Sequence, residues 1–270
     1  MNRLLVSLLV FCFLLTACQS PTPEVTSLPM QSVEIAVSAA ASLTESFNEI
    51  GSEFEKLHPE IKVTFNFAGS QALAEQINNS APVDVFASAS KKTMQAVIDT
   101  NHVAADASRQ FLSNKLVLII PARNPGNVTQ LQDLSKSGLK VVLAAKEVPV
   151  GQYSLDFLAK AAASGSFPTT FSEDVLKNVV SYEDNVKAVL TKVSLGEADA
   201  GIVYTTDAAS AEAGTIQTIA IPDQTNIPAS YFIAPMSGSK HPAEAKLFID
   251  YVLSQSGQDI LSKYGFIPVP

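Results

Sequence analysis

Hydrophobic residues recur along this chain at two spacings, one typical of strands and the other typical of helices. Val33, Ile35 and Val37 occupy alternate positions, as in a half-buried strand. Small residues follow, and from Leu43 to Leu57 apolar residues recur at steps of three and four, which indicates one face of a helix. The same order of strand, small or turn residues and helix start continues along the chain, so we expect parallel sheets built from βαβ units.

Further strands are predicted wherever a short run is apolar or alternating, and helices wherever the wider spacing follows. The predicted strands after the first are 61–67, 83–87, 116–120, 139–144, 179–182, 200–204, 216–221 and 231–234. Predicted helices begin near positions 70, 91, 150 and 186, and two more cover 241–253 and 257–264. The chain has no internal repeat of fixed period.

The first seventeen residues are predicted to be a signal peptide. Arg3 precedes an apolar stretch that is too short to span a bilayer comfortably, and the stretch ends in Leu15-Thr16-Ala17-Cys18, which resembles a lipobox. An ordinary secretory signal with an incidental cysteine is the alternative. We expect Cys18 to carry lipid, and residues 18–32, rich in Ser, Thr and Pro, to form a disordered tether. Cys12 lies in the removed segment, which leaves no cysteine pair for a disulfide.

The charge of the chain argues against a nucleic-acid partner. Its formal net charge is −8, from 18 basic and 26 acidic side chains, and it contains no run of Lys or Arg. Binding to nucleic acid requires a clustered basic face that neutralises phosphates. An anionic small ligand would therefore be bound by local dipoles and hydrogen-bond donors.

Four junctions share the build of apolar strand, small or turn residues and helix start. They are Ala41-Ser42, Gly69-Ser70, Val150-Gly151 and Asn185-Val186. Ligands of α/β sheets bind at the carboxyl ends of strands, and a helix start offers unpaired N–H groups and partial positive charge. Ser42 and Glu45 also fit a capping box, so the plain interpretation of such a serine is a helix cap. Together the four junctions predict an anion site.

The sequence contains none of the common catalytic motifs. It has no G-x-S-x-G elbow, no H-E-x-x-H, and no Walker or dinucleotide glycine pattern. Its three histidines, His58, His102 and His241, are widely separated. We therefore predict a binding protein and no enzyme, while a pure adhesion or scaffold role would leave the four junctions unexplained.

Seven motifs in order resemble the molybdate-binding proteins of ABC importers, a family with the type II periplasmic binding-protein fold. The resemblance covers Val33 to Pro270, and it is carried by AAASL, FAGSQALAEQI, APVDVFASA, EVPVGQY, EDNVKAVL, GIVY-TD and KYGF. It implies an α/β fold of two lobes with mixed, mostly parallel sheets and a hinge of two segments. Lobe I would be 33–114 plus 227–270 and lobe II 115–226, with crossings near 114–116 and 226–231.

The resemblance also implies the ligand set. Two serine hydroxyls, Ser42 and Ser70, the main-chain N–H groups of Val150 and Val186, and the hydroxyl of Tyr204 would hold the oxyanion, and Ser42 could add its own N–H. If the anion is molybdate, these same residues are the molybdenum-binding ones. Position 150 is often alanine in the family, and because this residue donates through its backbone, we expect the larger valine to have little effect.

The ligand predicted in this way is molybdate or tungstate, with no separate cofactor. Asp84 and Asp184 lie near the predicted site in sequence, but they are more simply solvated or capping carboxylates. A site made only of donors favours a fully ionised dianion over phosphate, which retains a proton. Sulfate remains an alternative ligand. A ferric chelate is disfavoured, because a ferric site requires clustered Tyr, His and carboxylate side chains and Tyr204 alone is in the predicted ligand set. We expect a lipid-anchored, extracytoplasmic monomer that delivers its ligand to the permease of an ABC importer.

Overall fold

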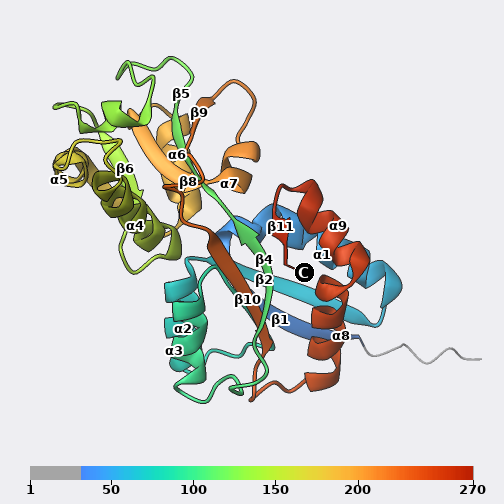
Figure 1. Cartoon of the computed structure of the whole chain (residues 1–270). Coiled ribbons are helices and arrows are strands. Elements are labelled where there is room, and N and C mark those ends of the chain that lie inside the picture. The colour runs from blue at the N-terminus through green and yellow to red at the C-terminus, as the bar shows by residue number, and fades with distance from the viewer. Residues whose placement is uncertain (1–31, 270) are drawn as a thin grey trace, which may run out of the picture. The chain divides into compact units, whose positions relative to one another are not determined.

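Two mixed β-sheets form the framework of residues 32–269, the part of the chain that this computed structural model describes (Figure 1). In sheet A the strand order is β11 (Ile267–Pro268), β4 (Arg109–Asn114), β10 (Ala229–Pro235), β3 (Val85–Ser88), β1 (Val33–Ala40) and β2 (Ile61–Ala68). In sheet B the order is β7 (Val179–Glu183), β6 (Val141–Ala144), β8 (Ala200–Tyr204), β5 (Leu116–Pro121) and β9 (Ile216–Ala220). The predicted signal peptide, Cys18 and all of the predicted tether except Ser32 lie outside the described residues.

Each sheet divides into a parallel half and an antiparallel half. The pairs β1–β2, β1–β3, β6–β7 and β6–β8 are parallel. The pairs that involve β4, β5, β9, β10 and β11 are antiparallel. The sheets are therefore mixed, as predicted, but the expectation that they are mostly parallel holds only for the half built from βαβ units. The reason is that β10 and β5 enter their sheets after the chain has changed sheets, and both run against the strands beside them.

Helices cover both faces of sheet A. The elements on this part of the chain are η1 (Ala41–Leu43), α1 (Thr44–Leu57), α2 (Ser70–Asn78), α3 (Lys91–Ile98), α8 (Pro242–Leu253) and α9 (Gln255–Lys263). In Figure 1, α2 and α3 lie on one side of the sheet, and α1, α8 and α9 lie on the other. Strand β3 shows why both faces are covered, because Val85 and Ala87 belong to the α1 and α8 core whereas Phe86 packs with α2 and α3.

Sheet B carries the remaining helices. They are η2 (Leu131–Ser135), α4 (Pro149–Ala163), α5 (Phe171–Lys177), α6 (Val186–Ser194) and α7 (Thr205–Ala209). Gly201 of β8 allows α6 to pack closely on the sheet, since a Cβ at this position would lie 2.9 Å from Val189 and 3.0 Å from Val193. Helix α6 therefore packs directly against β8, the strand that ends in Tyr204.

The chain passes between the sheets twice, once from β4 to β5 and once from β9 to β10. Asn226 ties these two connections together: its Nδ2 donates to the carbonyl of Leu116 (2.9 Å) and its Oδ1 accepts from the N–H of the same residue (3.1 Å). Asn114 at the end of β4 donates to Thr206 at 2.8 Å. The predicted lobe boundaries fall at these connections, and the division into two lobes stays a prediction.

Most predicted elements are present with shifted ends. The strands at 116–120, 200–204 and 216–221 match β5, β8 and β9 to within one residue, whereas the strand predicted at 83–87 begins at Val85. Strands β4 and β11 and helices α5 and α7 were not predicted. In β4 the two apolar residues Phe111 and Leu112 are adjacent, so the segment shows neither alternation nor a helical spacing.

None of the helices within residues 32–269 combines the length and the apolar character that crossing a membrane requires.

Candidate functional site

The structure brings all five residues of the predicted ligand set to one cavity. Ser42, Ser70, Val150, Val186 and Tyr204 line it, and the rest of the lining is apolar or uncharged: Ala40, Ala41, Ala68, Gly69, Ala89, Val148, Pro149 and Asn185. Ser42 and Ser70 follow strands of sheet A, and the other three follow or end strands of sheet B. The cavity is small, with about 10 Å³ open to the centre of a water molecule.

Three helices begin at the cavity. Ser70 is the first residue of α2, Val150 the second residue of α4 and Val186 the first residue of α6. N–H groups in the first turn of a helix have no partner inside the helix, and the helix dipole places partial positive charge there. Pro149 at the first position of α4 has no N–H of its own and presets the backbone for the helix. The main-chain groups of Val150 and Val186 are thus available as donors to an anion.

Two glycines allow the backbone to approach closely around the cavity. A Cβ on Gly151 would lie 2.0 Å from the carbonyl oxygen of Ala145, so only glycine fits between α4 and the turn after β6. A Cβ on Gly69 would lie 2.4 Å from the carbonyl oxygen of Asp184. Because Gly69 follows β2 and Asp184 follows β7, the second contact joins the sheet A and sheet B sides of the cavity.

Neither serine of the ligand set caps a helix. α1 begins at Thr44 after a 3-10 turn, its N-cap is Leu43, and no side chain caps it, so the capping box predicted from Ser42 and Glu45 is wrong. The hydroxyl of Ser42 instead lies 2.8 Å from the hydroxyl of Tyr231. Ser70 follows the N-cap Gly69, and its Oγ accepts a hydrogen bond from the N–H of Ala89 (3.0 Å). Tertiary contacts therefore hold both hydroxyls beside the cavity.

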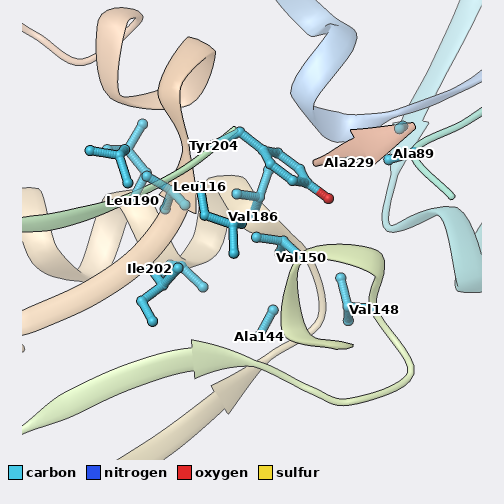
Figure 2. Close-up of a cluster of buried hydrophobic side chains, with 14 of the residues drawn as sticks. Ala89, Leu116, Ala144, Val148, Val150, Val186, Leu190, Ile202, Tyr204 and Ala229 are labelled. Carbon is cyan, nitrogen blue, oxygen red and sulfur yellow. The ribbon is translucent and has the colours of Figure 1, made fainter. Parts of the chain in front are cut away.

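Tyr204 extends from an apolar cluster into the site. Its side chain is 1% exposed and packs among residues that include Val150 and Val186, while its hydroxyl lies on the side toward Ala89 (Figure 2). Within the described chain this hydroxyl has no hydrogen-bond partner. Burial raises the pKa of the Tyr204 phenol well above its ordinary value, so the group keeps its proton and remains a donor. A buried hydroxyl without a partner indicates a place for a ligand.

A charged cluster that the sequence analysis missed lies behind the site. The ammonium of Lys187 contacts both carboxylate oxygens of Glu45 at 2.8 Å and lies 3.2 Å from Oδ1 of Asp207. Glu45 is on α1 and the other two are on α6 and α7, so the cluster joins the two sheets' helices. Burial raises the pKa of Asp207 to about 6, and the charge of Lys187 opposes this shift. Apart from the contact with Lys187, neither oxygen of this carboxylate is paired with another side chain between residues 32 and 269.

The other carboxylates considered from the sequence do not line the cavity. Asp84 accepts from the N–H of Ala36 (2.9 Å) and belongs to a different pocket that includes His241. Asp184 is exposed, and its carboxylate accepts from Asn185. Among residues 32–269 no group of three or more His, Cys, Asp or Glu side chains is placed to hold a metal ion.

Known proteins similar to this chain are extracellular solute-binding proteins. A family model described as "Bacterial extracellular solute-binding protein" matches residues 35–267. The molybdate-binding protein ModA of Mycobacterium tuberculosis is 35% identical over 254 residues, which cover 93% of this chain and 92% of that protein. The Bacillus subtilis protein named "Putative ABC transporter substrate-binding lipoprotein YvgL" is 33% identical over 235 residues, 87% of this chain and 86% of the relative.

Solved structures show the same fold. The periplasmic molybdate-binding protein of Azotobacter vinelandii aligns with a TM-score of 0.73 over 87% of this chain and 99% of its own, at 18% identity. At such low identity, the structural likeness is evidence for the fold alone. That fold agrees with the type II periplasmic binding-protein fold expected from the sequence. Because the family consists of solute-binding proteins, the chain is a binding component and no enzyme. This protein therefore belongs to the bacterial extracellular solute-binding protein family and is related to its molybdate-binding members.

Proposed function

We propose that this protein binds molybdate in the cavity between its two sheets and delivers it to the permease of an ABC importer. The observation that carries the proposal is the composition of the cavity, which has no charged lining residue and gathers three hydroxyls and the starts of three helices. The name of the relative from Mycobacterium tuberculosis supports molybdate as the ligand.

The hydrogen-bond chemistry of the cavity favours a dianion without protons. Ser42, Ser70 and Tyr204 can donate through hydroxyls, and Val150 and Val186 can donate through main-chain N–H groups. A hydrogen bond to a charged group contributes roughly 1.5–3 kcal/mol, so five donors contribute roughly 7.5–15 kcal/mol, which exceeds all but the upper part of an association cost of about 4–15 kcal/mol. A hydrogen phosphate ion carries a proton of its own and needs an acceptor for it. None of these five groups can accept that proton while it donates its own hydrogen to the anion.

The two sides of the cavity touch each other, which supports a ligand held between two lobes. The side chain of Gln71 donates to the carbonyl of Asp184 at 2.9 Å, and the hydroxyl of Tyr153 donates to the carbonyl of Ala89 at 3.4 Å. A ligand that contacts both sides binds the closed arrangement better than an open one and so stabilises it. This proposal includes the lobe boundaries at the two connections, 33–114 plus 227–270 and 115–226.

Four further features belong to the proposal. Tungstate has the same charge and shape as molybdate and is expected to bind as well. Cys18 is expected to carry a lipid anchor that holds a monomer at the outer side of a membrane, in line with the name of the Bacillus subtilis relative. Cys18→Ala should release the protein into the soluble fraction. The importer permease is the expected partner, and nucleic acid is not.

Calorimetric titration with molybdate, tungstate, sulfate and phosphate tests the proposal. We expect molybdate to bind at micromolar concentration or tighter and phosphate to bind weakly. Ser42→Ala with Ser70→Ala should weaken binding of molybdate at least a hundredfold, since each hydrogen bond to the anion accounts for about a factor of ten or more. Ser166→Ala, at an exposed serine outside the cavity, is the matched control.

Two results would overturn the proposal. Molybdate that fails to bind, or binds the double serine variant as tightly as the unmodified protein, excludes this site. Sulfate that binds as tightly as molybdate excludes the assignment of the ligand and favours a sulfate-binding protein with the same fold.

A further inference from the structure

We propose that Tyr231 is a positioning residue that fixes the direction in which the Ser42 hydroxyl donates, and thereby helps the site to select a fully ionised oxyanion. The inference deepens the proposed function and rests on it. Tyr231 does not line the cavity, and the proposed role is exerted through Ser42.

The contact is short and buried. Ser42 Oγ and Tyr231 Oη are 2.8 Å apart, the serine is 4% exposed and the tyrosine is fully buried. The side chains of Asn114 and Tyr204 also lie near the Tyr231 hydroxyl. The distance alone allows either oxygen to be the donor, so the direction has to be argued from the number of hydrogens.

Each hydroxyl has a single hydrogen to donate. If Ser42 donated to Tyr231, Ser42 would turn a lone pair toward the anion, and the tyrosine hydrogen could reach only the Tyr204 hydroxyl, which itself faces the cavity. If Tyr231 donates to Ser42, the serine hydrogen is free for the anion and no buried hydrogen lacks a partner once the ligand is bound. A phenol is also a better donor and a poorer acceptor than an alcohol. The hydrogen-bond chain therefore runs from Tyr231 to Ser42 to the ligand, and each bond strengthens the next.

Tyr231 is held rigidly enough to impose this direction. Its ring packs edge-on against Phe111, Phe266 and Tyr204, with centroid distances of 6.5, 5.6 and 5.9 Å. Strand β10 also shifts its register with β4 between Tyr231 and Phe232, and such an irregularity commonly redirects a side chain. Burial raises the pKa of the Tyr231 phenol well above its ordinary value, so the group retains the proton that it donates.

Ser70 has the same arrangement with a different donor. The N–H of Ala89 donates to Ser70 Oγ at 3.0 Å, and because a main-chain N–H cannot accept, the hydrogen of Ser70 is also free for the ligand. Both serines thus accept a hydrogen bond from behind and donate forward. At Ser70 the backbone sets this direction, whereas at Ser42 a replaceable side chain sets it, so only the second case can be tested by substitution.

The test compares Tyr231→Phe, Ser42→Ala and the double variant, with molybdate and phosphate as ligands. Tyr231→Phe keeps the ring and removes only the hydroxyl. Tyr251→Phe is the matched control, because Tyr251 does not line the cavity. We expect Tyr231→Phe to raise the dissociation constant for molybdate about tenfold, the effect of one hydrogen bond. Binding of phosphate should change less or improve, because the freed lone pair of Ser42 can then accept the proton that phosphate carries.

The double variant separates a positioning role from a structural one. If Tyr231 acts through Ser42, adding Tyr231→Phe to Ser42→Ala should cause no further loss of molybdate affinity. Equal losses for both anions, or losses that multiply in the double variant, would overturn the inference while the proposed function stood. Molybdate that fails to bind the unmodified protein would overturn both.

Discussion

Replacing Asp207 by asparagine should make this protein more stable at neutral pH and leave its stability in acid almost unchanged. The carboxylate is fully buried, and its one charged partner within residues 32–269 is Lys187 at 3.2 Å, which also pairs with Glu45. Asparagine has nearly the same shape and carries no charge. The substitution therefore removes the charge that burial disfavours, together with its ion pair to Lys187.

The magnitude follows from the pKa of Asp207, which burial raises from 3.8 to about 6. Well below pH 3.8 the group is protonated in both the folded and the unfolded chain and does not affect stability. As pH rises through 3.8 the unfolded chain loses the proton first, so the folded state loses stability until pH passes about 6. Well above pH 6 the loss is constant, and a difference of about two pKa units corresponds to about 3 kcal/mol.

Urea denaturation of the two proteins at pH 4, 5, 6 and 7 measures this effect. The free energy of unfolding of Asp207→Asn, minus that of the unmodified protein, should increase by about 2 kcal/mol from pH 4 to pH 7. Asp106→Asn removes an exposed carboxylate and is the matched control. A difference that stays flat across this range would refute the reasoning, because it would mean that Lys187 fully compensates the burial of Asp207.

Three other substitutions test separate parts of the structure. Gly151→Ala should lower the melting temperature and destabilise the fold by about 1–3 kcal/mol, because the new Cβ would lie 2.0 Å from the carbonyl of Ala145. Lys187→Met should speed release of molybdate a few-fold in stopped-flow measurements, because it removes an ion pair with Glu45 that joins α6 to α1. An unchanged release rate would show that this ion pair does not stabilise the closed form. Burial opposes ionisation of Asp133, but hydrogen bonds from the preceding turn outweigh this effect and hold the pKa of Asp133 well below its ordinary value. In acid denaturation, the stability advantage of the unmodified protein over Asp133→Asn should therefore shrink as pH falls below about 4.

The sequence was sufficient to predict the class of fold because the pattern of apolar residues repeats at the parallel strands. Strands β6 and β8, which pair in parallel, are continuous apolar runs, and both are buried along their whole length. The antiparallel half was harder to predict. β4 begins with Arg109 and Gln110, which are exposed, so its pattern resembles a loop, and its pairing with β10 depends on residues more than one hundred positions away.

The site could be predicted only in part, because helix signals in sequence do not reveal tertiary competition. Ser42 and Glu45 have the spacing of a capping box, yet the serine contacts Tyr231 and the glutamate contacts Lys187. Both contacts join segments far apart in the chain, and no local pattern encodes them. The buried state of Asp207 was missed for the same reason, although the residue lies within a motif that carried the resemblance.

Val150 shows why sequence variation at a main-chain donor says little about binding. Valine is larger than the alanine common in the family, and the side chain would matter if it pointed at the anion. In the structure it is 1% exposed and packs in the apolar cluster with Leu116, Ile202 and Val186 (Figure 2). The core of sheet B accommodates the additional methyl groups, while the N–H of the same residue keeps its position in the first turn of α4. A donor of this kind depends on where the helix begins, and Pro149 and Gly151 on either side of Val150 fix that point through their backbone requirements.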